Sequence, residues 1–89
     1  MKFQVSYEKR AIKSLKKLDP FQRKMILQWI EKHLVNTEDP FAHGKALKGN
    51  LGSYWRYRVG QYRIIAEIKA DKIEIIIVNI GHRKDIYER

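Results

Sequence analysis

Residues 55–63, Trp-Arg-Tyr-Arg-Val-Gly-Gln-Tyr-Arg, constrain the fold more than any other stretch of this chain, because they predict a β-hairpin together with its register. Gly60 and Gln61 fit a two-residue turn whose first position takes a positive φ, an angle that glycine adopts without strain. This turn would set Arg58 directly opposite Arg63. Because side chains alternate between the two faces of a strand, the turn also assigns every hairpin residue to a face.

The two faces of the predicted hairpin differ in chemistry. The face that suits a hydrophobic core carries Trp55, Tyr57, Val59, Tyr62, Ile64 and Ala66. The other face carries Arg56, Arg58 and Arg63, so two like charges stand opposite each other at a cost in stability. A phosphate bound between them would offset that cost, since guanidinium groups bind phosphate through paired hydrogen bonds. The alternative is a solvated face whose charges have no ligand.

Hydrophobic periodicity predicts two helices and two further strands around the hairpin. The expected elements are a strand over 2–7, helices over 8–18 and 20–35, a glycine-containing loop over 41–53, hairpin strands up to about residue 69, and an apolar strand over 73–80 that ends at Gly81. Asp19 can cap the second helix, and Pro20 suits its first position. The helix residues expected to face the core are Ala11, Ile12, Leu15 and Leu18, then Phe21, Met25 and Trp29, with Ile26, Ile30 and Leu34 as further candidates.

This order of elements predicts the fold class. We expect an α+β fold in which two helices pack on one face of a mostly antiparallel four-stranded sheet. With 89 residues, the chain has the length of a single domain, residues 1–89. The strand over 73–80 is apolar enough to be central and covered on both faces, or nearly so.

Charge and composition narrow the partners. Nineteen Lys and Arg against ten Asp and Glu give a net charge of +9, which favours nucleic acid, an acidic protein or an anionic membrane as partner. The absence of cysteine excludes disulfides and thiolate chemistry. No close-spaced ligand set predicts a metal, and we expect no cofactor. Without a leader or an apolar run of about 20 residues, a cytoplasmic location away from membranes is expected.

Residues 81–87, Gly-His-Arg-Lys-Asp-Ile-Tyr, form a second candidate site where the last strand ends. His82 can carry a proton near neutral pH, Arg83 can stabilise phosphate charge, and Tyr87 can stack on a base. If the substrate is RNA, its 2′-hydroxyl can attack the adjacent phosphate without a metal. Arginines would stabilise the developing charge but hardly ever lose a proton. His33 and His43 are interpreted as structural residues.

The chain resembles the RelE/ParE superfamily of toxins from toxin–antitoxin modules, and within it the RelE branch of messenger-RNA endonucleases. The resemblance spans nearly the whole chain and includes residues 10–18 and 44–49. It is most specific in residues 55–63 and 81–87. It implies ribosome-dependent cleavage of mRNA in the A site, leaving a 2′,3′-cyclic phosphate and a 5′-hydroxyl. It also implies three partners: a cognate RelB-like antitoxin, the 70S ribosome with its mRNA, and DNA only indirectly through the antitoxin complex.

The resemblance also implies roles for individual residues. The expected catalytic set is Arg56, Arg58, Arg63 as a phosphate clamp, His82, Arg83 as a transition-state stabiliser or leaving-group assistant, and Tyr87 stacked on the substrate base. Further phosphate contacts are expected from Lys45, Lys48 and Lys84. Some relatives have lysines at the positions of Arg56 and Arg58, and lysine can be tuned into a base where arginine cannot. The general base is therefore open between His82, Tyr87 and a reaction that relies on electrostatics and positioning by the ribosome.

Two other functions fit the same sequence. A ParE-like toxin would share the fold and inhibit DNA gyrase by binding, without RNase chemistry. A non-catalytic RNA- or ribosome-binding module would bind in a salt-sensitive way and leave no cut ends. The arginine cluster together with His82 and Tyr87 favours the RNase over the ParE-like toxin.

Overall fold

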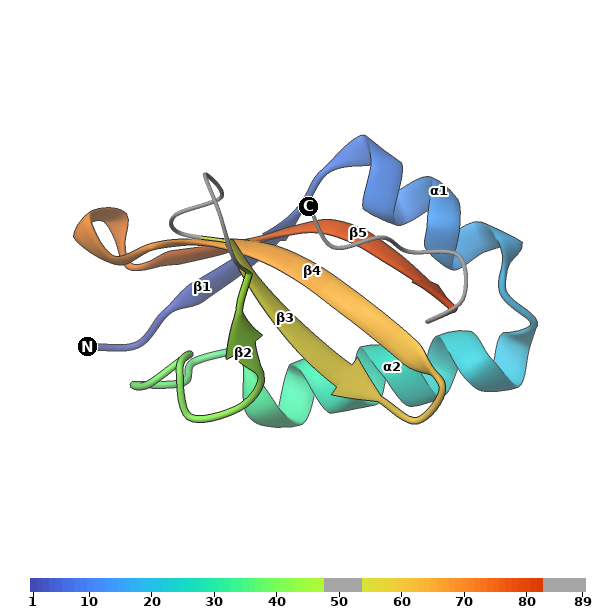
Figure 1. Ribbon diagram of the computed structural model, residues 1–89, viewed down its shortest axis with the longest axis horizontal. Helices are drawn as coiled ribbons and strands as arrows, with labels where there is room; N and C mark the ends of the chain where they lie inside the picture. The colour runs from blue at the N-terminus through green and yellow to red at the C-terminus, as the bar shows by residue number, and fades with distance from the viewer. Residues whose placement is uncertain (48–53, 83–89) are drawn as a thin grey trace.

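Figure 1 shows the computed structural model of the chain, which describes residues 1–47 and 54–82. In chain order the elements are β1 (Gln4–Tyr7), α1 (Lys9–Lys17), α2 (Pro20–His33), β2 (Lys45–Ala46), β3 (Tyr54–Val59), β4 (Tyr62–Lys69), a short 3-10 helix η2 (Ala70–Lys72) and β5 (Glu74–His82). The strands form one sheet in the order β1-β5-β4-β3-β2. Only the β1–β5 pair is parallel among these neighbours, so the predicted α+β class with a mostly antiparallel sheet is confirmed.

The sheet has five strands, whereas four were predicted. The additional strand, β2, lies inside the segment predicted to be a loop, and two residues are too few to show alternation. Lys45 pairs with Arg56, and Ala46 with Trp55, at the edge of β3. Gly44 allows β2 to lie this close to β3 because it has no Cβ atom, and a Cβ atom at this position would collide with the carbonyl oxygen of Arg56. Its φ of +77° is also one that residues with a side chain rarely adopt.

The β3–β4 hairpin has the predicted register, with Arg58 opposite Arg63 across the turn. Gly60 at the first turn position has a φ of 59°, as the two-residue turn requires. The predicted core face is confirmed. Its buried members are Tyr57, Val59, Ile64 and Ala66, with Trp55 and Tyr62 partly buried and packed against them.

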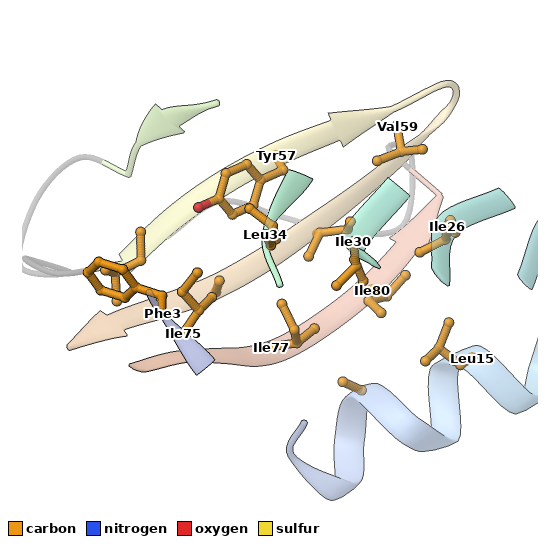
Figure 2. Close-up of a cluster of buried hydrophobic side chains, with 14 residues drawn as sticks. Phe3, Leu15, Ile26, Ile30, Leu34, Tyr57, Val59, Ile75, Ile77 and Ile80 are labelled. Atoms are coloured by element: carbon orange, nitrogen blue, oxygen red, sulfur yellow. The ribbon is translucent and has the colours of Figure 1, made fainter. Parts of the chain in front are cut away.

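Both helices contribute to the core on that same face of the sheet. Figure 2 shows Leu15 of α1, and Ile26 and Ile30 of α2, directed toward Ile77 and Ile80 of β5. All five side chains belong to one buried cluster. Within residues 1–47 and 54–82, neither α1 nor α2 packs on the opposite face of the sheet.

The junction between the helices is built as predicted, with one addition. The Asp19 side chain accepts a hydrogen bond from the backbone N–H of Gln22 at 2.9 Å, and Pro20 begins α2. Arg23 adds a contact that the sequence did not indicate. Its guanidinium donates to the carbonyl oxygens of Leu15 at 3.0 Å and Leu18 at 2.9 Å, which satisfies the end of α1.

Two helix residues predicted to face the core are exposed: Phe21 by 72% and Ile12 by 41%. The row that α2 turns to the sheet is Ile26, Ile30 and Leu34, which are fully buried. These residues recur every four positions, and Phe21 lies one position away from the extension of that row. The helix α2 also ends at His33, two residues earlier than predicted.

The last strand is longer than predicted. Gly81 pairs with Arg63, and His82 with Tyr62, so Gly81 does not end the strand. The ladder continues because β4 runs up to the hairpin turn and offers partners to both residues. Only one face of β5 is fully covered, because Ile76 remains partly exposed between two buried neighbours.

Candidate functional site

The sheet face opposite the helices carries four basic side chains from three strands, which we call the arginine face. Its members are Lys45 from β2, Arg56 and Arg58 from β3, and Arg63 from β4. The register sets Lys45 beside Arg56, and Arg58 beside Arg63. All four were predicted to bind phosphate, and the fold places them on a common face.

A shallow pocket of about 220 Å³ lies within this face, lined by Gly44, Lys45, Arg56 and Arg58. It is smaller than the ~300–1,000 Å³ pockets that hold drug-sized ligands. Three of its four lining residues are cationic, and the fourth, Gly44, is exposed to solvent. These dimensions and this charge suit a compact anion such as a phosphate group.

The arginine side chains on this face differ in burial. The Nε atoms of Arg56 and Arg63 are buried, whereas the Arg58 side chain is exposed. Beside them, Leu47 and Ile65 form a small buried apolar cluster. An apolar surround lowers the local dielectric constant and strengthens the attraction between these cations and an anion.

Tyr54 belongs to the same face and was missed by the sequence reasoning. It packs against the apolar cluster of Leu47 and Ile65. It also lies two positions before Arg56 in β3, so both side chains are on the same face of the sheet. An aromatic ring beside arginines is the arrangement on which an unpaired nucleic-acid base stacks. The spacing of two residues between Tyr54, Arg56 and Arg58 was the signal that could have placed Tyr54 on this face.

Gly44 gives this face a test that needs no ligand. Gly44→Ala is expected to destabilise the fold by about 1–3 kcal/mol, because alanine is strained at this positive φ and its Cβ would push β2 away from Arg56. Gly60→Ala is the matched control: it carries the same kind of strain, but its Cβ would come no closer than 3.7 Å to Met25. Urea unfolding of both variants measures the difference. Equal losses would mean that the close approach of β2 does not contribute to stability.

His82 does not lie on the arginine face. It is paired with Tyr62, and their rings contact each other at a centroid distance of 5.6 Å. Tyr62 packs against the core on the helix side, whereas the preceding residue, Gly81, pairs with Arg63. The strand alternation therefore puts the sheet between His82 and the arginines with which the sequence analysis grouped it.

His82 instead lines a groove of about 710 Å³ between α1 and the adjoining ends of β4 and β5. Arg10, Lys13 and Lys17 of α1 form one wall, and Tyr62 lies with His82 on the other side. Among the described residues that line this groove, none is acidic. We call it the α1 groove, a second cationic surface on the helix side.

The remaining predicted site residues are Lys48, Arg83, Lys84 and Tyr87, and they lie outside the described residues. Their roles stay predictions. Within residues 1–47 and 54–82, no group of three or more His, Cys, Asp or Glu is arranged to hold a metal ion. No helix in the same ranges has the length and apolar character to cross a membrane.

Comparison with known proteins gives consistent relatives. A family model described as the ParE toxin of type II toxin–antitoxin systems, parDE, matches residues 5–87. Toxin RelG of Mycobacterium tuberculosis is 28% identical over 89 residues, with 100% of both chains covered. A protein named toxin RelE1 of Methanocaldococcus jannaschii is 36% identical, covering 99% of this chain and 98% of its own.

A solved structure extends the likeness to the fold. The toxin–antitoxin complex RelBE2 from Mycobacterium tuberculosis contains a chain that superposes with a TM-score of 0.83 at 25% sequence identity. The match covers 96% of this chain and 95% of that one. The two-helix, sheet-based architecture is thus shared over nearly its whole length.

Proposed function

The chain belongs to the RelE/ParE superfamily of toxins from type II toxin–antitoxin systems, and from this premise we propose that it is a ribosome-dependent endoribonuclease. It would cleave messenger RNA in the ribosomal A site and so stop translation in the cytoplasm, acting as one domain of residues 1–89. The 2′-oxygen of a ribose bonds to the adjacent phosphorus, and the bond from phosphorus to the 5′-oxygen breaks. The products are a 2′,3′-cyclic phosphate and a 5′-hydroxyl.

The observation that carries this proposal is the direct opposition of Arg58 and Arg63 on a face that the helices leave open. Two like charges at that spacing are unfavourable in the absence of an anion. As the 2′-oxygen attacks, negative charge builds on the phosphoryl oxygens. Fixed guanidinium groups beside that charge lower the barrier, and losing one such donor costs roughly 100- to 1,000-fold in rate in enzymes that use them.

The reaction also needs a base for the 2′-hydroxyl and an acid for the 5′-oxygen. Arginine serves poorly as a base because it stays protonated. The position of His82 across the sheet counts against it as the base for a phosphate held on the arginine face. In this proposal, either Tyr87 acts as the base or the reaction relies on electrostatics and on positioning of the RNA by the ribosome. Arg83 acts as the leaving-group assistant.

The chemistry of the cut tests the proposal. An mRNA with a 2′-deoxyribose at the nucleotide before the scissile phosphate is expected to resist cleavage, because the nucleophile is missing. The unmodified mRNA should be cut in the same translating extract and should carry a cyclic phosphate at the new 3′ end. Cleavage of the deoxy-substituted position would contradict attack by the 2′-hydroxyl.

The antitoxin is the second partner that we propose, as a RelB-like protein. The similar Mycobacterium tuberculosis structure is that of a toxin–antitoxin complex. In this chain, the described lining of the α1 groove includes Arg10, Lys13 and Lys17 and no acidic residue. An acidic antitoxin segment is complementary to that wall and would pack its apolar side chains beside Tyr62.

Charge reversal separates this groove from the rest of α1. We expect Lys13→Glu/Lys17→Glu to weaken antitoxin binding by about tenfold or more, because both exposed lysines face the groove. Lys9→Glu/Lys16→Glu makes the same charge change on exposed positions of the same helix that do not line the groove. Titration calorimetry with the antitoxin encoded beside the toxin gene compares the two.

Growth assays show which function a groove variant has lost. With an antitoxin site, the Lys13/Lys17 variant still arrests growth, and co-expressed antitoxin no longer rescues the cells. Equal rescue of both double variants would contradict the assignment. Loss of growth arrest by the Lys13/Lys17 variant alone would instead assign the groove to RNA or the ribosome.

A second candidate function is inhibition of DNA gyrase by binding. It is favoured by the description of the matching family model, which names parDE toxins. Under this function the arginine face would have no catalytic role. Growth arrest without any new mRNA ends would favour it over the RNase.

A further inference from the structure

Two histidines and a tryptophan form a cluster on the helix side of the sheet, next to the loop that leads into β2. The ring centroids of His33, at the end of α2, and His43, in the loop before β2, are 4.8 Å apart. Trp29 contacts both rings, at 4.8 Å from His33 and 5.9 Å from His43. This arrangement packs two imidazole rings directly against each other.

The cluster is joined to the anion pocket through the backbone of His43. The carbonyl oxygen of His43 accepts a hydrogen bond of 2.6 Å from the indole N–H of Trp55 on β3. The next residue, Gly44, lies against the Arg56 carbonyl, and Lys45 then pairs with Arg56. A displacement of His43 would therefore carry Gly44 and Lys45, two of the pocket's lining residues, with it.

The charged groups that act on His33 are positive. Desolvation lowers the pKa of His33 below its ordinary value, and the nearby His43 and Lys32 lower it further. On the β3 side, the cluster meets Tyr57, whose ring lies 5.5 Å from that of Trp29. Its hydroxyl donates to the Pro40 carbonyl at 2.6 Å, and burial, followed by the charge of Asp39, raises its pKa, so it stays neutral.

We propose that the His33–His43 pair is a pH-sensitive clasp for the segment that carries Lys45, closed when the pair is neutral and loosened when both rings are protonated. Loosening would weaken anion binding at the arginine face. This regulatory role rests on the proposed RNA-binding function of that face, whereas the clasp itself can be measured without RNA.

The direction of the effect follows from proton linkage. When the two rings separate, His33 loses the desolvation and the neighbouring positive charge that lower its pKa, so the loosened state binds more protons than the clasped state. Acidification through about pH 6.5 therefore favours loosening, and a rise in pH restores the clasp.

Nuclear magnetic resonance titration tests the clasp directly. In the wild-type protein, the His33 ring is expected to titrate below pH 6.5, and the Trp55 indole N–H signal should shift with the same midpoint. In His43→Gln, which keeps a polar side chain but cannot be protonated, the His33 midpoint should rise. An unchanged His33 midpoint in His43→Gln, or a Trp55 signal that ignores the titration, would overturn the clasp.

Binding of a 2′-O-methyl tetraribonucleotide, which cannot be cut, tests the consequence. Its affinity is measured at pH 7.5 and pH 5.5 for the wild type and for His33→Gln/His43→Gln. Acidification makes the protein more positive outside the pair, so the double variant is expected to bind more tightly at pH 5.5. The increase in RNA affinity from pH 7.5 to pH 5.5 should be smaller in the wild type than in the variant, by a factor of about three or more, because the clasp loosens.

The two possible failures give different results. Identical pH dependence of RNA binding in both proteins would overturn the regulatory role of the clasp. No binding by either protein at either pH would contradict the proposed function of the arginine face, while the titration of His33 and Trp55 would still decide whether the clasp exists.

Discussion

Arg63→Ala is expected to lower the rate of mRNA cleavage by about a hundredfold or more while the protein stays folded. Arg63 lies on the open face of the sheet directly opposite Arg58, and its partly held guanidinium is the more buried of the two. Removing it deletes a charge that would face the phosphate in the transition state. It also relieves the repulsion between the two arginines, which is worth roughly 0.2–1 kcal/mol in a cross-strand pair.

Two measurements and one control variant separate activity from stability. Primer-extension rates in a translating extract report cleavage, and thermal unfolding reports the fold. Arg63→Lys keeps the positive charge but loses the paired hydrogen-bond geometry, so it should fall between the wild type and Arg63→Ala. A large drop in melting temperature for Arg63→Ala, with cleavage lost only in proportion, would show that the residue is structural.

Trp55→Ala is expected to have the opposite signature, destabilising the fold by about 3 kcal/mol, near the lower end of the range for a tryptophan truncated in a core. Trp55 is packed against the core at its edge, and its ring also contacts Phe41 at 4.9 Å. Its indole N–H donates to the His43 carbonyl, so the truncation also releases the loop before β2. Urea unfolding measures the loss.

Trp55→Phe divides this effect into its two causes. It keeps an aromatic ring in place, removes the hydrogen bond to His43 and loses only part of the packed ring, so a loss of about 1 kcal/mol is expected. If Trp55→Ala unfolds at the wild-type urea concentration, the assignment of Trp55 to the core face is wrong. If the two variants lose the same stability, the hydrogen bond dominates over the packing.

The parts of the fold that the sequence predicted well are set by local chemistry. Gly60 fixes the turn, the turn fixes the pairing of Arg58 with Arg63, and strand alternation then places the whole arginine face. Asp19 and Pro20 likewise mark the start of α2 through contacts within one helical turn. Each of these features depends on residues only a few positions apart.

The predictions that failed depend on partners far away in sequence. The strand β2 exists because an edge of β3 is available to it, and Gly44 reveals this only through its contact with Arg56. Phe21 has a core-like side chain, yet the orientation of α2 turns Ile26 toward the sheet instead. Apolar character alone does not show which of two adjacent rows a helix will bury.

The candidate site divides in the same way. The basic residues of the hairpin were placed correctly because the register of one turn controls them all. His82 was grouped with them because it follows the last strand, but the continued pairing with Tyr62 carries it to the helix side. The contact between His33 and His43 depends on the path of a whole loop, which no spacing in the sequence reveals.

One measurement tests the central claim most directly: mapping of new mRNA ends by primer extension after the purified protein is added to a translating extract, with Arg63→Ala alongside. The account predicts cuts in phase with codons that appear only when ribosomes are present and that nearly vanish with Arg63→Ala. An absence of cuts with the wild-type protein, while its expression still arrests growth, would contradict the RNase and assign the toxicity to a protein target.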